Sequence, residues 1–299
     1  MNLHRVLIIC GSAMALMPAL AQDGGSDAAA SFIKNNVAAK VQSGVANKLE
    51  SLVDNLEVTI TGLENAKPAY NVVKIQPLVD NQADGTVVFL QLSANRTADR
   101  NTANVGLGYR KLVADRKIIV GLNGFYDNEW THKHERASAG LELLSSVGDI
   151  RFNQYWALSD LQSGKNGVAE RALDGYDVEL ALPLPYLPLT KVHAKTFKYD
   201  GNDSAKEIKG ETLSLRSALP FGFTFEAGTT SYDDATPEHD FLSLSYNTTF
   251  GDDGAKANLV SDSAYQLDPI EDRRFEKVRR SNIITKEVGG SAVVIVTGV

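Results

Sequence analysis

From about residue 56 to residue 250, hydrophobic and polar residues alternate along the chain with a period of two. In the segment 221–229, for example, Phe223 and Phe225 alternate with Thr224 and Glu226. Successive side chains of a β-strand point to opposite faces, so this period predicts strands with one apolar and one polar face. Several alternating runs extend over about 10 residues, which is long for a soluble sheet and suits a tilted membrane-spanning strand.

About twelve strands can be drawn, and an even number is typical of bacterial single-chain barrels. Their predicted starts lie near residues 56, 70, 85, 102, 116, 134, 148, 174, 189, 208, 220 and 240. Short connections, at 114–115, 145–148, 183–188 and Pro220, alternate with longer polar ones at 128–134, 160–172, 200–207 and 232–240. This alternation predicts an all-β fold, a transmembrane antiparallel β-barrel over residues 56–250, with its short turns in the periplasm.

Three segments flank the predicted barrel. Residues 1–21 have the features of a signal peptide, with an A-x-A motif that predicts cleavage between Ala21 and Gln22. Within residues 22–55, apolar residues three or four apart predict a short periplasmic amphipathic helix. Phe250 is predicted to be the aromatic residue that closes the barrel, and residues 251–299 form a linker long enough to thread the pore.

Composition narrows the function classes. The chain has 299 residues, a formal net charge of −7 and a sequence pI of about 5.3, which argues against nucleic acid as a partner. Its single cysteine, Cys10, lies inside the predicted signal peptide. The mature chain therefore offers no disulfide and no cysteine-based zinc site, and we predict no cofactor.

Several segments resemble the inverse autotransporter β-domain, the outer-membrane anchor of the intimin and invasin adhesins. The best match is GLNGFYDNEWTHKHERASAGLELL (121–144), followed by ERALDGYDVELALPLPYLP (170–188) and NVGLGYRKL (104–112). A fourth segment, FEKVRRSNIITKEVGG (275–290), resembles the linker that follows the barrel in that family.

The resemblance implies an order of parts: signal peptide, periplasmic segment, twelve-stranded barrel, then a linker that re-enters the pore and carries a passenger outside. Cell adhesion belongs to the passenger's immunoglobulin-like domains, and no run of such domains is evident before residue 299. The partners it implies are outer-membrane lipid and the barrel-assembly machinery. A host or cell-surface partner is expected only where a passenger exists.

Reactive side chains gather in two predicted outer loops. One contains His132, His134 and Glu135, a set that could hold a borderline metal ion. The other contains Asp233, Asp234, His239 and Asp240, a set that could orient a water molecule for hydrolysis. His193 is a further candidate, by residue type alone, for the histidine of a Ser-His lipase-type site. Since none of these sets includes a convergent nucleophile and base, we predict no catalytic site. Because no helix fixes the histidines and their loop lies at the barrel rim, we predict no metal site.

Charged and polar residues on the polar phase of the strands predict the lumen lining, because charge is costly on the lipid face. These residues are Arg110, Lys117, Asn123, Asp127, Arg151, Asp177, Glu179, Lys195, Arg216 and Glu226. They either solvate and cross-link the lumen or line a path for an extended linker. The glycines Gly106, Gly108, Gly121, Gly124 and Gly140 are expected to serve curvature and close packing.

The sequence therefore predicts a translocator and anchor barrel of an inverse autotransporter in the bacterial outer membrane, linked to protein secretion and surface display, without catalytic activity. Two alternatives stay open. A passive pore or structural barrel would end at its last strand, whereas about 49 residues come after Phe250 here. An outer-membrane hydrolase would need a nucleophile and base at one rim.

Overall fold

The computed structural model describes residues 55–62, 68–201, 207–219, 222–233, 238–248, 260–288 and 291–293. The predicted signal peptide with its Ala21–Gln22 cleavage site, the amphipathic segment up to residue 54, and Phe250 lie outside the described residues. Among the described residues, no helix is long and apolar enough to cross a membrane.

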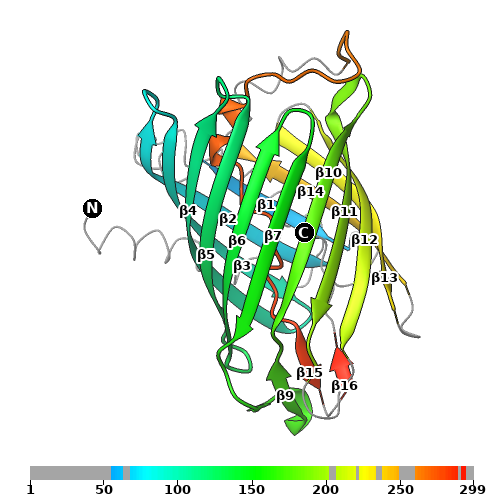
Figure 1. Ribbon diagram of the computed structural model, residues 1–299. Coiled ribbons are helices and arrows are strands. Elements are labelled where there is room, and N and C mark those ends of the chain that lie inside the picture. Colours follow the sequence, from blue (N-terminus) through cyan, green and yellow to red (C-terminus); the bar gives the residue numbers. More distant parts are fainter. Residues whose placement is uncertain are drawn as a thin grey trace, which may run out of the picture.

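Twelve antiparallel strands close into a barrel (Figure 1). They are β1 (Leu56–Thr61), β2 (Ala69–Asn81), β3 (Thr86–Thr97), β4 (Arg100–Val113), β5 (Ile118–Glu129), β6 (His134–Ser145), β7 (Asp149–Ala157), β10 (Gly175–Leu184), β11 (Leu187–Tyr199), β12 (Ile208–Ala218), β13 (Phe223–Tyr232) and β14 (His239–Asn247). Each strand pairs with the next in this order, and β14 pairs with β1. Every start lies within three residues of its prediction, so the predicted fold class is confirmed.

The barrel has two unlike ends. Short turns at 114–117, 146–148, 185–186 and 219–222 lie at one end, which we call the short-turn end. The opposite end, which we call the long-loop end, carries the connections 62–68, 98–99, 130–133, 158–174, 200–207 and 233–238. Of these, 98–99 is as short as the turns at the other end, so the difference in length holds only from β5 onward. Within 158–174 lie β8 (Gln162–Ser163), the 3₁₀ turn η2 (Lys165–Gly167) and β9 (Ala169–Ala172). They form part of a second, four-stranded sheet, in the order β16-β15-β9-β8, below the barrel in Figure 1.

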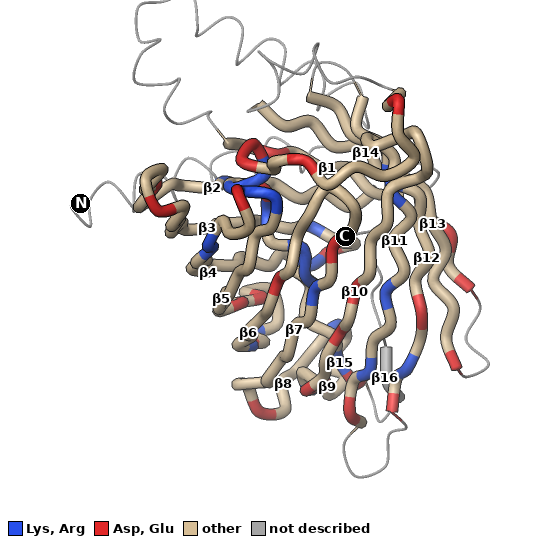
Figure 2. The backbone as a smooth tube through the Cα atoms, turned by 45° about the horizontal axis from the view of Figure 1, so that its top comes forward, with Lys and Arg blue, Asp and Glu red and all other residues tan. Residues whose placement is uncertain are grey.

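The two faces of the wall differ in chemistry. Outward-facing Leu107, Leu122 and Leu213 expose more than half of their surface, as side chains in contact with lipid would. By contrast, the inward-facing Arg110 of β4 and Asp127 of β5 are fully buried. Acidic and basic residues recur along strands around the ring (Figure 2). The lumen of the barrel is therefore filled by packed side chains, many of them charged.

Two apolar clusters lie inside the barrel among these charges. The cluster at the short-turn end contains Phe89, Leu112, Ile119, Leu144 and, from the segment after the barrel, Val278. The cluster at the long-loop end contains Tyr155, Leu173, Phe197, Tyr199 and Ile208. The segment after the barrel is therefore part of the core at the short-turn end.

Inward-facing glycines on β4 make room for aromatic rings of the neighbouring strands. A Cβ atom on Gly106 would lie 2.2 Å from the Phe125 ring, and one on Gly108 would lie 2.2 Å from the Phe89 ring. These contacts, with Gly106 opposite Phe125 and Gly108 opposite Phe89 in the sheet register, place the rings flat against the wall. They explain the close-packing role predicted for these two glycines.

Replacing Gly106 with leucine should displace the Phe125 ring and destabilise the barrel by about 1–3 kcal/mol, the usual effect of overpacking a core. The measurement is the temperature at which the purified barrel loses its fast-migrating folded band in detergent gels. Gly124→Ala is the matched control, because a Cβ atom there would meet only the Ser138 carbonyl at 3.7 Å. An equal shift in both variants would contradict the packing account.

Candidate functional site: the occupied barrel lumen

The segment after β14 first crosses the short-turn end of the barrel. The backbone N–H of Ser261 donates to the Tyr186 carbonyl at 2.9 Å, in the turn between β10 and β11. The N–H of Asp268 donates to Ser146 Oγ at 2.8 Å, and the N–H of Ile270 donates to the Arg116 carbonyl at 2.9 Å. Residues 260–270 are thus fixed to three successive short turns before the chain enters the lumen.

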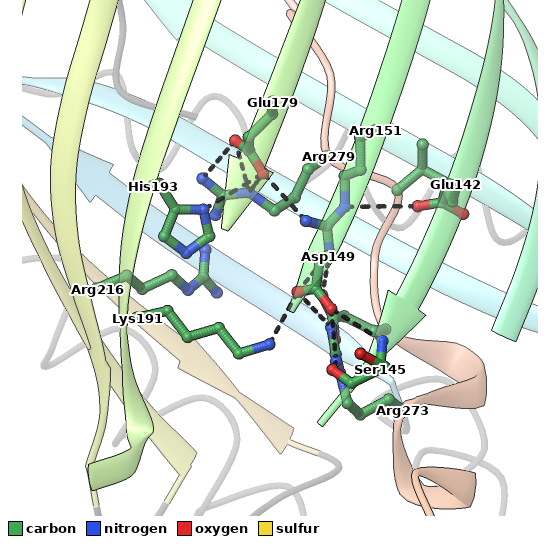
Figure 3. Close-up of polar contacts among 12 residues, drawn as sticks. Glu142, Ser145, Asp149, Arg151, Glu179, Lys191, His193, Arg216, Arg273 and Arg279 are labelled. Carbon is green, nitrogen blue, oxygen red and sulfur yellow. Dashed lines mark hydrogen bonds and ion pairs between the residues drawn. The ribbon is translucent and has the colours of Figure 1, made fainter. Parts of the chain in front are cut away.

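The chain enters the lumen through the 3₁₀ turn η5 (Glu271–Phe275). There Arg273 binds both carboxylate oxygens of Asp149 at 2.9 Å and donates to the Ser145 carbonyl at 2.8 Å (Figure 3). From the wall, Arg110 donates to the carbonyl of Glu276 at 2.6 Å. These charge-assisted bonds hold the point where the chain turns into the barrel.

Inside the lumen, cations of this segment pair with inward-facing carboxylates of the wall. Lys277 Nζ lies 2.5 Å from a Glu57 oxygen of β1. Arg279 binds Glu179 of β10 at 3.1 Å and Glu226 of β13 at 3.3 Å. Arg280 binds Asp127 of β5 at 2.5 Å. Figure 3 shows Arg279 reaching Glu179 beside His193. Each of these three buried cations therefore has a wall carboxylate as partner, as the burial of a charge requires.

Arg279 and Arg280 reach different walls of the barrel. Adjacent residues of an extended chain point to opposite sides, and β5 is three strand positions from β10 and six from β13 in the ring of twelve strands. The consecutive arginines therefore connect two walls through one short stretch of backbone.

Wall side chains also satisfy the backbone of this segment, which has no strand neighbour within the lumen. Gln91 accepts from the Val278 N–H at 2.8 Å and donates to the Val278 carbonyl at 3.4 Å. Arg136 donates to the carbonyls of Ser281, at 2.6 Å, and Ile283, at 3.1 Å. Asn104 donates to the Asn282 carbonyl at 3.0 Å. Buried backbone groups need such partners, so the lumen is built to hold an extended chain.

At the long-loop end the segment joins the second sheet. Leu173 N–H donates to the Thr285 carbonyl at 3.0 Å. Beyond it, β15 (Lys286–Val288) pairs antiparallel with β9 and with β16 (Ser291–Val293). Lys286 forms an ion pair with Glu129 at the end of β5. The segment thus runs from one end of the barrel to the other.

Glu170 of β9 attaches the second sheet to the barrel rim. Its carboxylate accepts from Arg100 at 2.9 Å and lies 3.1 Å from His134 Nε2. Burial alone would raise the pKa of Glu170, but the hydrogen bonds from Arg100 and His134 outweigh it and lower this pKa to about 2.

A lowered pKa of a folded carboxyl group gives stability that is complete above its unfolded pKa, near 4.5, and is lost as the pH falls through about 2. The attachment of β9 should therefore persist at pH 4 and fail close to pH 2. This attachment is measured as the protection of the 158–174 connection against protease in the purified barrel. Glu170→Gln should lower protection at neutral pH and flatten its decline with acid. An unchanged acid profile in this variant would contradict the assignment to Glu170.

The residues predicted to line the lumen can now be placed. Seven are buried on the inward phase of their strands: Arg110, Asn123, Asp127, Arg151, Asp177, Glu179 and Glu226. Lys195 and Arg216 are half-buried and lie opposite Glu179 and Glu226 in the sheet register. Lys117 lies in the turn before β5 and not on a strand. Five of the predicted residues contact the segment in the lumen directly: Arg110, Asp127, Arg151, Glu179 and Glu226.

Several residues that bind the segment were not among those predicted. Glu57, Glu129 and Asp149 provide carboxylates, and Gln91 and Arg136 provide backbone contacts. All lie on the inward phase of their strands. Strand phase alone could have found them.

The reactive residues of the outer loops are not brought together into a site. His134 contacts Glu170, and His193 lies 3.3 Å from Glu179 inside the lumen. Within the described part of the chain, no group of three or more His, Cys, Asp or Glu residues is placed to hold a metal ion. Asp234 lies outside the described residues. The absence of catalytic activity stays a prediction.

Residues 11–282 match the family described as the inverse autotransporter β-domain. The inverse autotransporter adhesin YeeJ of Escherichia coli K12 is 28% identical over 143 residues, which cover 46% of this chain and 6% of the adhesin. A putative attaching and effacing protein homolog of the same organism is 26% identical over 135 residues, which cover 43% of each protein. The matched part thus spans less than half of either relative.

A solved structure reported under the heading "Unveiling the Mechanism Behind the in-meso Crystallization of Membrane Proteins" has the same fold. Its TM-score is 0.67 at 19% identity, and the match covers 78% of this chain and 98% of the solved one. The family match extends over most of the chain and includes the whole barrel. The chain therefore belongs to the inverse autotransporter β-domain family, and it is a bacterial outer-membrane β-barrel.

Proposed function

We propose that this chain is a translocator and membrane anchor, which passes its own C-terminal segment through the barrel and holds an attached passenger at the cell surface. The short-turn end would face the periplasm, as short turns do in outer-membrane barrels, and the long-loop end would face the outside. The barrel then starts and ends its twelve strands in the periplasm, so the chain after β14 must cross the membrane again to be displayed.

One observation carries this proposal: the stretch from Glu276 to Lys286 runs inside the barrel and meets a wall partner at almost every step. Side chains of Arg110, Gln91 and Arg136 bind its backbone, and wall carboxylates bind its cations. A simple diffusion pore has no use for such partners. A path for an extended chain needs wall side chains that bind the backbone and wall carboxylates that bind the cations. Without them, the polar backbone and the charges of the chain would be buried without partners.

The proposal includes partners. The exposed leucines of the wall suit outer-membrane lipid, and a barrel of this kind needs the barrel-assembly machinery to insert. Adhesion to a host or to another cell would be a property of a passenger attached to the linker, by analogy with the adhesin relative YeeJ. The barrel itself would contribute anchoring and display without catalysis.

A short epitope fused after residue 299 tests the proposal. We expect antibody to label intact cells that make the fusion, and labelling to be as strong as after the outer membrane is opened. The control carries the same epitope in the 82–85 turn between β2 and β3, also at the short-turn end, and should be labelled only after opening. Labelling of the first fusion only after opening would refute display through the barrel.

A further inference from the structure

The guanidinium of Arg280 occupies a socket formed by Asp127, Phe125 and Tyr155, which we call the Asp127 socket. Its two terminal nitrogens bind the two carboxylate oxygens of Asp127, at 2.9 and 2.5 Å. Its central carbon lies 4.5 Å from the centre of the Phe125 ring and 5.6 Å from that of Tyr155. Arg280 is 2% exposed, so the guanidinium is held away from water.

Wall residues hold this socket in shape independently of residue 280. Asp127 also accepts hydrogen bonds from Arg136 Nε at 2.8 Å and from Asn104 at 2.7 Å. Tyr155 donates its hydroxyl hydrogen to Asp177 at 2.6 Å. The Phe125 ring lies against Gly106, where no side chain competes for the space. Arg136 also lies over the Tyr155 ring, with its central carbon 4.3 Å from the ring centre. The rings and the carboxylate are therefore positioned without the Arg280 guanidinium.

We propose that the Asp127 socket is a guanidinium-selective binding site, which accepts arginine at position 280 and, when that side chain is absent, a small free guanidinium ion. A planar guanidinium can bind both oxygens of one carboxylate while its faces lie against aromatic rings. An ammonium group is a compact, strongly hydrated point charge that reproduces neither the paired bonds nor the stacking.

The neighbouring arginine provides a contrast within the same molecule. Arg279 binds the carboxylates of Glu179 and Glu226, at 3.1 and 3.3 Å. Of the aromatic rings in the described residues, none stacks on its guanidinium. Arg279 does bind both Glu179 oxygens, through Nε at 3.1 Å and Nη2 at 3.2 Å. Because it lacks the stacking rings, its site should discriminate less between guanidinium and ammonium than the Asp127 socket does.

The binding of Arg280 in the Asp127 socket needs no export of the C-terminal segment, so it is separate from the proposed display. Its consequence is a fixed register. A shift of the chain by one residue would bring Arg279 or Ser281 level with the socket. Both of these side chains point to the side of the extended chain opposite to that of Arg280. The arginine at position 280 therefore sets how far the chain advances through the barrel.

Chemical rescue of the full-length Arg280→Ala variant tests this site. The purified variant should lose its folded, fast-migrating band at a lower temperature than the wild type. Methylguanidinium should restore the wild-type temperature, with half-maximal effect at a concentration about tenfold lower than methylammonium needs. Arg279→Ala, treated in parallel, should show a clearly smaller difference between the two ions. If the variant does not fold, the same ions are added during refolding and the recovered folded band is measured.

Two results would overturn the proposal. One is equal rescue of Arg280→Ala by both ions. The other is undiminished rescue by methylguanidinium when Asp127→Asn is added to Arg280→Ala, because that change removes the carboxylate that the guanidinium must bind. Arg280→Lys gives an independent check: it should be nearly as unstable as Arg280→Ala. Wild-type stability in Arg280→Lys would show that charge alone suffices.

Discussion

Deleting residues 270–299 should raise the conductance of the purified barrel several-fold in planar bilayers. The deleted stretch includes every residue that crosses the lumen, among them Lys277, Arg279 and Arg280, each of which fills space against the wall. Its removal takes away the cations that face Glu57, Glu226 and Asp127 and leaves these wall carboxylates with fewer opposite charges, so the enlarged path should also favour cations over anions.

A shorter deletion, of residues 291–299, is the matched control because it leaves the lumen segment and its ion pairs in place. Its conductance should equal that of the whole chain. The folded band in detergent gels must be present in both deletions, so that a conductance change reports an open lumen and not a damaged barrel. Equal conductance of the whole chain and the longer deletion would contradict the occupied lumen.

Replacing Leu122 with arginine should strongly impair membrane assembly. Leu122 lies on the outward face of β5 and is 53% exposed, where it contacts lipid in the membrane. An arginine near the bilayer midplane of a barrel costs roughly 2–4 kcal/mol. The measurement is the fraction of the chain that fractionates with the outer membrane and migrates as the folded form.

Leu122→Phe is the control, since it keeps an apolar side chain on the lipid face. We expect it to assemble like the wild type. Equal assembly of the arginine and phenylalanine variants would mean that this face of β5 does not meet lipid, and that the assignment of inward and outward faces is wrong.

The strands were predictable because a barrel repeats one simple rule twelve times. Lipid outside and a polar lumen inside force alternation, so Leu122 and Asn123 could be assigned to opposite faces from their order alone. Turn length then fixed the direction of each strand. Lys117 is an exception to this rule. It has the inward phase but lies in a turn, because β5 begins only at Ile118.

Partners across the lumen could not be predicted in the same way. The pairing of Arg280 with Asp127 depends on how far the chain has advanced through the barrel, which neither strand phase nor charge determines. Tyr155 and Gln91 bind the segment without any charge that would single them out. The pairing of β15 with β9 joins pieces of three and four residues, too short to show a period.

Labelling of two engineered cysteines tests most directly whether the chain crosses the barrel from one end to the other. Cys10, in the predicted signal peptide, is the chain's only native cysteine. Glu287, in β15, lies at the long-loop end, and Tyr265, 57% exposed, lies at the short-turn end. A maleimide that cannot cross membranes should label Glu287→Cys in intact cells and Tyr265→Cys only after the outer membrane is opened. Labelling of both, or of neither, in intact cells would contradict the crossing.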